Sequence, residues 1–140
     1  MKPVLISILL LLSISAYAQT RSTEEVYNHH AEALLNRDKA ELMKDYDENS
    51  VLITPDGKVN KGLKEISNTF DYALSEVFPL NIELYKIQEV IQDEIVFLVY
   101  KVSNAATGEM LMPFAVDTFV IKDGKIRYQT VAAQMPEQKQ

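Results

Sequence analysis

The stretch Tyr46–Gly62 constrains the fold most, because helical patterns precede it and, after one further helix, only strand patterns follow. Its sequence is YDENSVLITPDGKVNKG. Its β-branched content favours a short strand over Ser50–Thr54, and the Pro-Asp-Gly run at 55–57 is typical of a turn that leads into a return strand. Helices first and a long antiparallel sheet last predict an α+β fold.

Three helices are predicted in the first half of the chain. The first spans Thr20–Asn36, with Ser22 or Thr23 as its N-cap and two glutamates in its first turn. The second is short and begins at Asp38. The third spans 62–77, where apolar residues recur at helical spacing.

Four long strands are predicted after the third helix, where the hydrophobic period changes to two. They are Asn81–Gln92, Glu94–Asn104, Glu109–Lys122 and Lys125–Ala133, with turns near Asp93 and at 107–108 and 123–124. The run at 95–100 is apolar at consecutive positions, so both faces of the sheet should be covered. Helices can cover one face, and a second copy of the chain can cover the other, which predicts a homodimer.

The first eighteen residues have the pattern of a secretory leader. A basic Lys2 precedes a mainly apolar run over Val4–Ile14, and Ala-Tyr-Ala at 16–18 fits a cleavage site. The run is shorter than the roughly 20 residues that span a bilayer. We therefore expect residues 1–18 to be a signal peptide and 19–140 to form one domain exported to the periplasm or the medium. An uncleaved amphiphilic anchor is the alternative.

The charge of the predicted mature chain excludes several classes of partner. Removal of Lys2 leaves 13 Lys/Arg against 20 Asp/Glu, a net charge of −7. This balance disfavours nucleic acid and anionic membranes as partners. The chain has no cysteine, so it forms no disulfide.

Motifs for phosphate, metal and nucleophilic chemistry were not found in the sequence. It has four glycines and no glycine-rich phosphate loop. The two histidines, His29 and His30, are adjacent and point about 100° apart on a helix, so we predict no metal site. No serine lies in a nucleophile-elbow context. We predict that no metal or organic cofactor is required.

Two polar residues stand in apolar patterns and are the candidates for chemistry. Asp117 lies within the strand sequence FAVDTFVI, and His30 lies on the apolar stripe of the first helix. A carboxylate in such a strand is either exposed or buried with a partner. The structural alternative is that Asp117 faces solvent or a second copy and that His30 is a satisfied core histidine.

The element order and two motifs resemble a known superfamily. The motifs are Y-x-x-x-S-V-x-I-x-P-D-G followed by K-G, and V-D-T-F-V-I-K-D-G-K-I near the C-terminus. Together they resemble the nuclear transport factor 2-like proteins, which include SnoaL-like polyketide cyclases, ketosteroid isomerase and scytalone dehydratase. The resemblance implies a curved antiparallel sheet wrapped around three N-terminal-half helices as a cone, with a mostly apolar pocket at the open end.

Comparison with ketosteroid isomerase implies roles for three residues. Asp117 takes the place of the strand aspartate that is a protonated acid in the oxyanion hole, where the isomerase has I-D-x-F-R-F. His30 takes the place of the helix tyrosine of that hole. Thr54 takes the place of the catalytic aspartate, and a threonine does not act as a base near neutral pH.

Three functions remain open at this point. The first is an exported protein that binds a small apolar ligand without catalysis. The alternative is a cofactor-free isomerase, cyclase or dehydratase that acts next to a carbonyl through His30 and Asp117, which would face one another across the pocket as an acid/base couple. The third is a non-catalytic dimerisation module. The residues expected to contact a ligand are Tyr27, Tyr46, Thr54, Phe70, Met112, Phe114, Phe119 and Tyr128.

Overall fold

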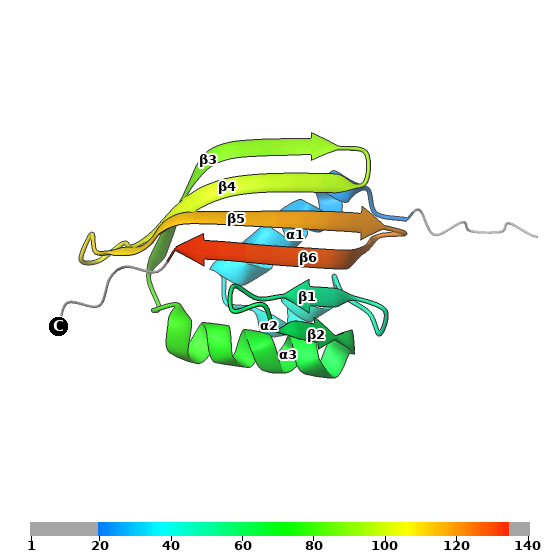
Figure 1. Ribbon diagram of the computed structural model, residues 1–140, viewed down its shortest axis with the longest axis horizontal. Coiled ribbons are helices and arrows are strands. Elements are labelled where there is room, and N and C mark those ends of the chain that lie inside the picture. The colour runs from blue at the N-terminus through cyan, green and yellow to red at the C-terminus, as the bar shows by residue number, and fades with distance from the viewer. Residues whose placement is uncertain (1–19, 135–140) are drawn as a thin grey trace, which may run out of the picture.

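The computed structural model describes residues 20–134 (Figure 1). The predicted leader at 1–18 lies outside the described residues. Within them, no helix is both long enough and apolar enough to cross a bilayer.

Two capped helices open the fold. Helix α1 spans Thr23–Leu35, and Ser22 caps it in a reciprocal box with Glu25. Helix α2 spans Lys39–Met43, where the Asp38 side chain accepts a hydrogen bond from the backbone of Glu41. The predicted helix starts are therefore confirmed to within three residues, because side-chain caps specify them locally.

The central stretch folds as predicted into a hairpin followed by a helix. Strands β1 and β2 span Val51–Ile53 and Val59–Lys61 and pair antiparallel. Helix α3 spans Gly62–Tyr72 and continues as a π-helical turn, η1, over Ala73–Val77. The guanidinium of Arg37 donates to the carbonyl oxygens of Phe78 and Pro79 at 2.9 and 3.2 Å, which holds the end of η1 against the end of α1.

The four predicted long strands are present. They are β3 Ile82–Gln92, β4 Ile95–Asn104, β5 Met110–Lys122 and β6 Lys125–Gln134. The sheet order is β2-β1-β6-β5-β4-β3. The predicted antiparallel pairing is confirmed for the four long strands, and β1 pairs parallel to β6 at their edge. The sheet is mixed, since β1 lies parallel to its neighbour β6 whereas the other neighbouring strands are antiparallel.

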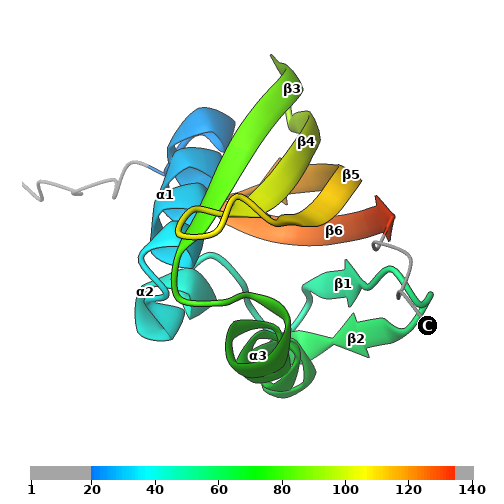
Figure 2. The same ribbon diagram turned by 90° about the vertical axis from the view of Figure 1, so that its left-hand side faces the viewer.

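The sheet curves around the helices, so that it has an inner and an outer face. Figure 2 shows α1 along the inner face of the long strands and α3 beside β1 and β2. The core lies on the inner face. Its most deeply buried members include Val26, Leu42, Leu52, Ile66, Val96, Val102, Ala115, Phe119, Ile121 and Ile126.

A β-bulge at Arg127 sets which residues of β6 face inward. Ile126 is paired with Ile121, but Tyr128 rather than Arg127 is paired with Val120. The extra residue shifts the alternation by one, so that Gln129 faces inward and Tyr128 outward.

A buried carboxylate ties the helices to the sheet. Asp45 is fully buried, and it accepts hydrogen bonds from Arg21 at 2.8 Å and from His29 at 2.9 Å. Its backbone carbonyl accepts from the N–H of Ile126 on β6 at 2.7 Å. Arg21 also donates to the carbonyl of Gly124 in the β5–β6 turn. One residue therefore joins the N-terminal segment, α1 and the last hairpin.

This junction predicts a pH-dependent contribution of His29 to stability. The hydrogen bond to Asp45 raises the pKa of His29 above 6.5, so the fold favours the protonated ring. The stabilisation is complete below pH 6.5 and is lost as the pH rises through the raised pKa of the folded protein. Between pH 6 and 9, the free energy of unfolding should fall by about 0.5–1 kcal/mol more in the native chain than in His29→Gln. Urea unfolding at each pH measures this; parallel curves for the two proteins would contradict it.

Candidate functional site

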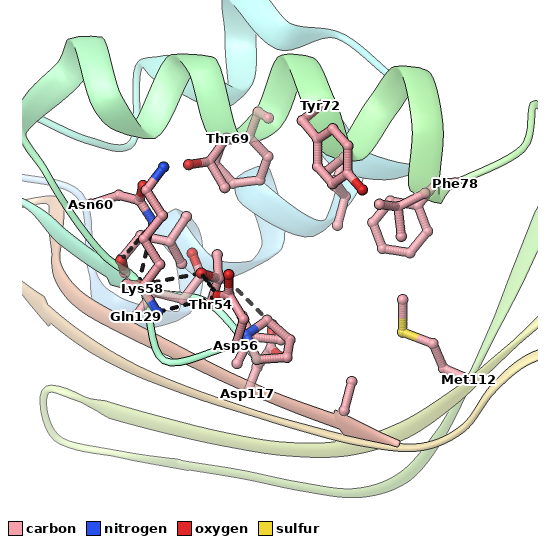
Figure 3. A pocket seen from close by; sticks show the side chains of 18 of the residues that line it. Thr54, Asp56, Lys58, Asn60, Thr69, Tyr72, Phe78, Met112, Asp117 and Gln129 are labelled. Atoms are coloured by element: carbon pink, nitrogen blue, oxygen red, sulfur yellow. Dashed lines mark hydrogen bonds between the residues drawn. The ribbon is translucent and has the colours of Figure 1, made fainter. Parts of the chain in front are cut away.

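A cavity of about 490 Å³ lies between α3, η1 and the inner face of the sheet (Figure 3). We call it the main cavity. Most of its lining is apolar. The apolar lining residues include Leu34, Leu52, Phe70, Ala73, Val77, Phe78, Met112, Val131 and Ala133. A volume of this size and an apolar lining are typical of small-molecule sites.

A smaller cavity of about 70 Å³ lies against α1, β3 and β4. We call it the rear cavity. His30, Tyr100 and Asp117 line both cavities. These three polar residues therefore lie where the two spaces approach each other.

Asp117 is the buried acid of the main cavity. It lies on the inner face of β5, and only 8% of its surface is exposed. The Tyr100 hydroxyl donates to Oδ1 at 3.1 Å, and the Gln129 amide donates to Oδ2 at 3.3 Å. Burial raises the pKa of Asp117 to about 7, although both hydrogen bonds act in the opposite direction. At neutral pH, a substantial share of the molecules therefore carries a protonated carboxyl that can donate a hydrogen bond.

A hydrogen-bonded chain connects Asp117 to α1. Gln129 accepts a hydrogen bond from the Tyr46 hydroxyl through its own side-chain oxygen. The Tyr46 oxygen lies 3.5 Å from Nδ1 of His30. His30 and Asp117 both line the main cavity, but no hydrogen bond joins them directly, and the path between them runs through Tyr46 and Gln129.

His30 is a neutral, aromatic-packed residue. It is 3% exposed, and its ring meets those of Tyr46, Phe70 and Phe119 edge-on at centroid distances of 5.8, 6.1 and 5.3 Å. Burial lowers the pKa of His30 to about 4, and the charges of Asp45 and His29 change it less. A base with this pKa is weak at neutral pH. The environment favours the core-histidine interpretation over a general base.

The other predicted ligand residues divide into those at the main cavity, those at the rear cavity and those that line neither. Thr54, Phe70 and Met112 line the main cavity, and Tyr46 reaches it through Gln129. Tyr27 and Phe119 line the rear cavity, and the Tyr27 hydroxyl donates to Glu89 at 2.6 Å.

Two of the predicted ligand residues are wrong. Phe114 and Tyr128 line neither cavity and are 46% and 56% exposed. Tyr128 faces outward because of the bulge at Arg127. Phe114 precedes the buried Ala115 in β5 and takes the opposite face.

Sequence reasoning missed the two direct partners of Asp117. Tyr100 is paired with Ala115 across β4 and β5, which places its ring on the face of Asp117 and within diagonal reach. Gln129 is paired with Phe119, whose ring is buried. Pairing the two predicted strands across the turn at 107–108 could have placed Tyr100 near Asp117 on the same face of the sheet. The bulge at Arg127 reverses the alternation in β6, so the sequence pattern did not show that Gln129 faces inward.

The rim of the main cavity is polar. Thr54 donates to Asp56 at 2.6 Å, and the backbone N–H of Lys58 also donates to Asp56. These hydrogen bonds lower the pKa of Asp56, so this carboxylate is ionised at neutral pH. Among residues 20–134, no cluster of three or more His, Asp or Glu side chains is arranged to hold a metal ion.

We predict that His30 and Asp117, at the two ends of this series of hydrogen bonds, titrate nearly independently. In an NMR titration, the His30 ring should change near pH 4 and the Asp117 carboxyl near pH 7. Asp117→Asn should move the pKa of His30 by less than about one unit, because Tyr46 and Gln129 separate the groups. A larger movement would contradict this arrangement and restore the acid/base couple. His29, which titrates above 6.5, is the internal reference.

Comparisons with known proteins identify the fold. No family model matches the sequence, and no curated protein matches it significantly. The structure is similar to that of a candidate ketosteroid isomerase from Kribbella flavida, with a TM-score of 0.65, 13% identity, and coverage of 88% of this chain and 87% of that one.

Two further solved structures agree. A candidate polyketide cyclase from Sinorhizobium meliloti gives a TM-score of 0.62 and 18% identity, covering 76% of this chain and 92% of that one. An NTF2-like protein of unknown function from Cytophaga hutchinsonii gives a TM-score of 0.63 and 15% identity, covering 83% of this chain and 94% of that one. The chain therefore has the NTF2-like fold, a curved, open mixed sheet with its helices in the N-terminal half.

Proposed function

We propose that this protein binds a small, mainly apolar carbonyl compound in the main cavity, with the Asp117 carboxyl as hydrogen-bond donor. The observation that carries the proposal is a carboxyl with a pKa of about 7 in the wall of an apolar cavity. The hydrogen bonds from Tyr100 and Gln129 offset only part of the cost of burying this carboxyl, because its pKa remains raised, so its place in the cavity wall supports a use. The resemblance to ketosteroid isomerase, in which this position is a protonated acid, supports the same role.

The size of the main cavity indicates the size of the ligand. A volume of 490 Å³ equals that of about sixteen water molecules in the liquid. A ligand of roughly ten to twenty non-hydrogen atoms therefore fits. Its carbonyl oxygen would accept from Asp117, and its apolar body would contact Phe70, Val77 and Met112.

Binding without turnover is the function that we favour. The low pKa of His30 makes it a poor base, and Thr54 stands at the position of the isomerase base. The leader pattern at 1–18 supports export of this binding protein.

One observation favours catalysis next to the carbonyl as a second candidate. The Asp56 carboxylate lines the same cavity as Asp117. In this version Asp56, rather than His30, removes a proton from the carbon beside the carbonyl, and the resulting enolate oxygen takes a hydrogen bond from Asp117. Exchange of these hydrogens for deuterium in D₂O, lost in Asp56→Asn, would support it. Absence of exchange with a bound ketone would leave binding alone.

We predict that the affinity for a simple ketone falls as the pH rises through 7. The probe is 4-phenylbutan-2-one, followed by NMR chemical-shift titration between pH 5.5 and 8.5. Protonated Asp117 donates to the ketone and ionised Asp117 does not, so binding is tighter below pH 7. Asp117→Asn keeps a donor at every pH and should remove the pH dependence. Equal affinity across this range in the native chain would contradict the role of Asp117.

A matched pair of tyrosine variants tests the geometry. The Tyr100 hydroxyl lowers the pKa of Asp117, so Tyr100→Phe should move the midpoint of the pH dependence upward. Tyr128→Phe removes a tyrosine hydroxyl from the exposed outer face instead and should leave the midpoint of the pH dependence unchanged. A shift with Tyr128→Phe would show that the pH dependence arises elsewhere.

We also propose that a second copy of the chain covers the outer face of the sheet. Two rows of this face are apolar, Val99 beside Val116 and Ile95 beside Val120 and Tyr128, and the row between them holds Phe97 beside Thr118 and Thr130. Ile95 and Tyr128 are half exposed in the single chain. Such a face in the middle of a sheet suits a self-complementary contact.

The homodimer is tested by light scattering of the native chain at about 100 µM, which should give twice the mass of one chain. Phe97→Lys places a charge in the centre of this face and should give a monomer. Val59→Lys, at an exposed position on β2, is the matched control and should remain dimeric. A native monomer would overturn the proposal.

A further inference from the structure

Asn60 lies on the inner face of the sheet, at the end of the main cavity away from Met112 (Figure 3). It is paired with Leu52 on β1, and Leu52 is paired with Gln129 on β6. Asn60 and Gln129 therefore belong to one row across the sheet, two strand spacings or about 10 Å apart. Gln129 is one of the two residues that donate a hydrogen bond to Asp117.

The side-chain amide of Asn60 has one orientation. Its Nδ2 donates to the carbonyl oxygens of Leu52 and Lys58 at 3.3 and 3.4 Å. The reversed orientation would place Oδ1 against these two oxygens, so the position of Oδ1 is determined.

The Oδ1 atom of Asn60 has no hydrogen-bond donor. The residue is 0% exposed, and within residues 20–134 this oxygen is the single buried side-chain polar atom that lacks a partner. An unsatisfied buried acceptor costs free energy, and such an atom in a native fold calls for an explanation. Because Asn60 forms part of the wall of the main cavity, a group inside the cavity can supply the missing donor.

The surroundings of Asn60 are polar, in contrast to the other end of the cavity. Lys58 and Thr69 line the cavity near it, whereas Phe78 and Met112 lie at the far end in Figure 3. A ligand that spans the cavity therefore meets polar groups at the end where β2 and α3 meet.

We propose that Asn60 Oδ1 accepts a hydrogen bond from a hydroxyl of the ligand, so that the ligand is a carbonyl compound with a hydroxyl group remote from its carbonyl oxygen. This inference rests on the proposed binding of a carbonyl at Asp117. It adds a second polar anchor and defines the ligand class as hydroxyketones.

Three probes that differ at one position test the inference. They are 4-phenylbutan-2-one, 4-(4-hydroxyphenyl)butan-2-one and 4-(4-methoxyphenyl)butan-2-one. The hydroxyl compound should bind about three- to tenfold more tightly than the parent, as expected for one hydrogen bond to a buried acceptor. The methoxy compound has an acceptor but no donor and should show no gain. Equal affinities of the parent and hydroxyl compounds would overturn the inference.

Variants locate the effect. Asn60→Leu should reduce the ratio of the parent and hydroxyl dissociation constants to about one. Asn49→Leu changes an exposed asparagine outside both cavities and should retain the ratio. Should Asn60→Leu fail to fold, the three probes still decide the question on the native chain. Retention of the ratio in a folded Asn60→Leu would overturn the inference.

The two proposals can fail separately. If the parent ketone binds with the pH dependence due to Asp117 but the hydroxyl adds nothing, only the role of Asn60 is overturned. If none of the three probes binds, the proposed function is overturned as well.

Discussion

The burial of Asp45 is the constraint on which the arrangement of helices and sheet depends. A carboxylate without access to water must be neutralised and hydrogen-bonded, and its partners come from the N-terminal segment, α1 and β6. The cavity depends on this junction. His30 follows His29 on α1 and Tyr46 follows Asp45, so the contacts of Asp45 also position two members of the chain of hydrogen bonds that ends at Asp117.

The buried polar side chains around Asp117 all have hydrogen-bond partners, whereas Asn60, at the β2 end of the same cavity, has an acceptor without one. Asp117 is held by Tyr100 and Gln129, and Gln129 in turn is held by Tyr46. Each of these contacts joins different elements, so the network makes the inner face rigid where the strands are longest. At the β2 end the network stops, and Asn60 is left with a free acceptor. Asn60 is therefore the part of the cavity wall at which a ligand would supply the missing hydrogen-bond donor.

Local signals predicted most of this fold, and non-local pairing explains what they missed. Caps, turn residues and hydrophobic periods lie within a few residues of the elements that they specify, so the order and bounds of helices and strands followed from them. Neither the parallel pairing of β1 with β6 nor the bulge at Arg127 leaves such a signal. The bulge moved Tyr128 out of the site and Gln129 into it. Asp117, which the resemblance singled out, lines the main cavity, but the resemblance carried no information about its hydrogen-bond partners.

The same desolvation acts in opposite directions on the two titratable residues that the sequence singled out. It lowers the pKa of His30 and raises that of Asp117, and in both cases it favours the neutral form. Below pH 7 the interior of the main cavity is therefore largely uncharged, while the Asp56 carboxylate lies ionised at its rim. A charged ligand group placed at protonated Asp117 would lose its hydration and gain no opposite charge, whereas a neutral carbonyl would gain a hydrogen bond. The electrostatics of the site thus select for uncharged, hydrogen-bonding ligands, and this selection follows from burial alone.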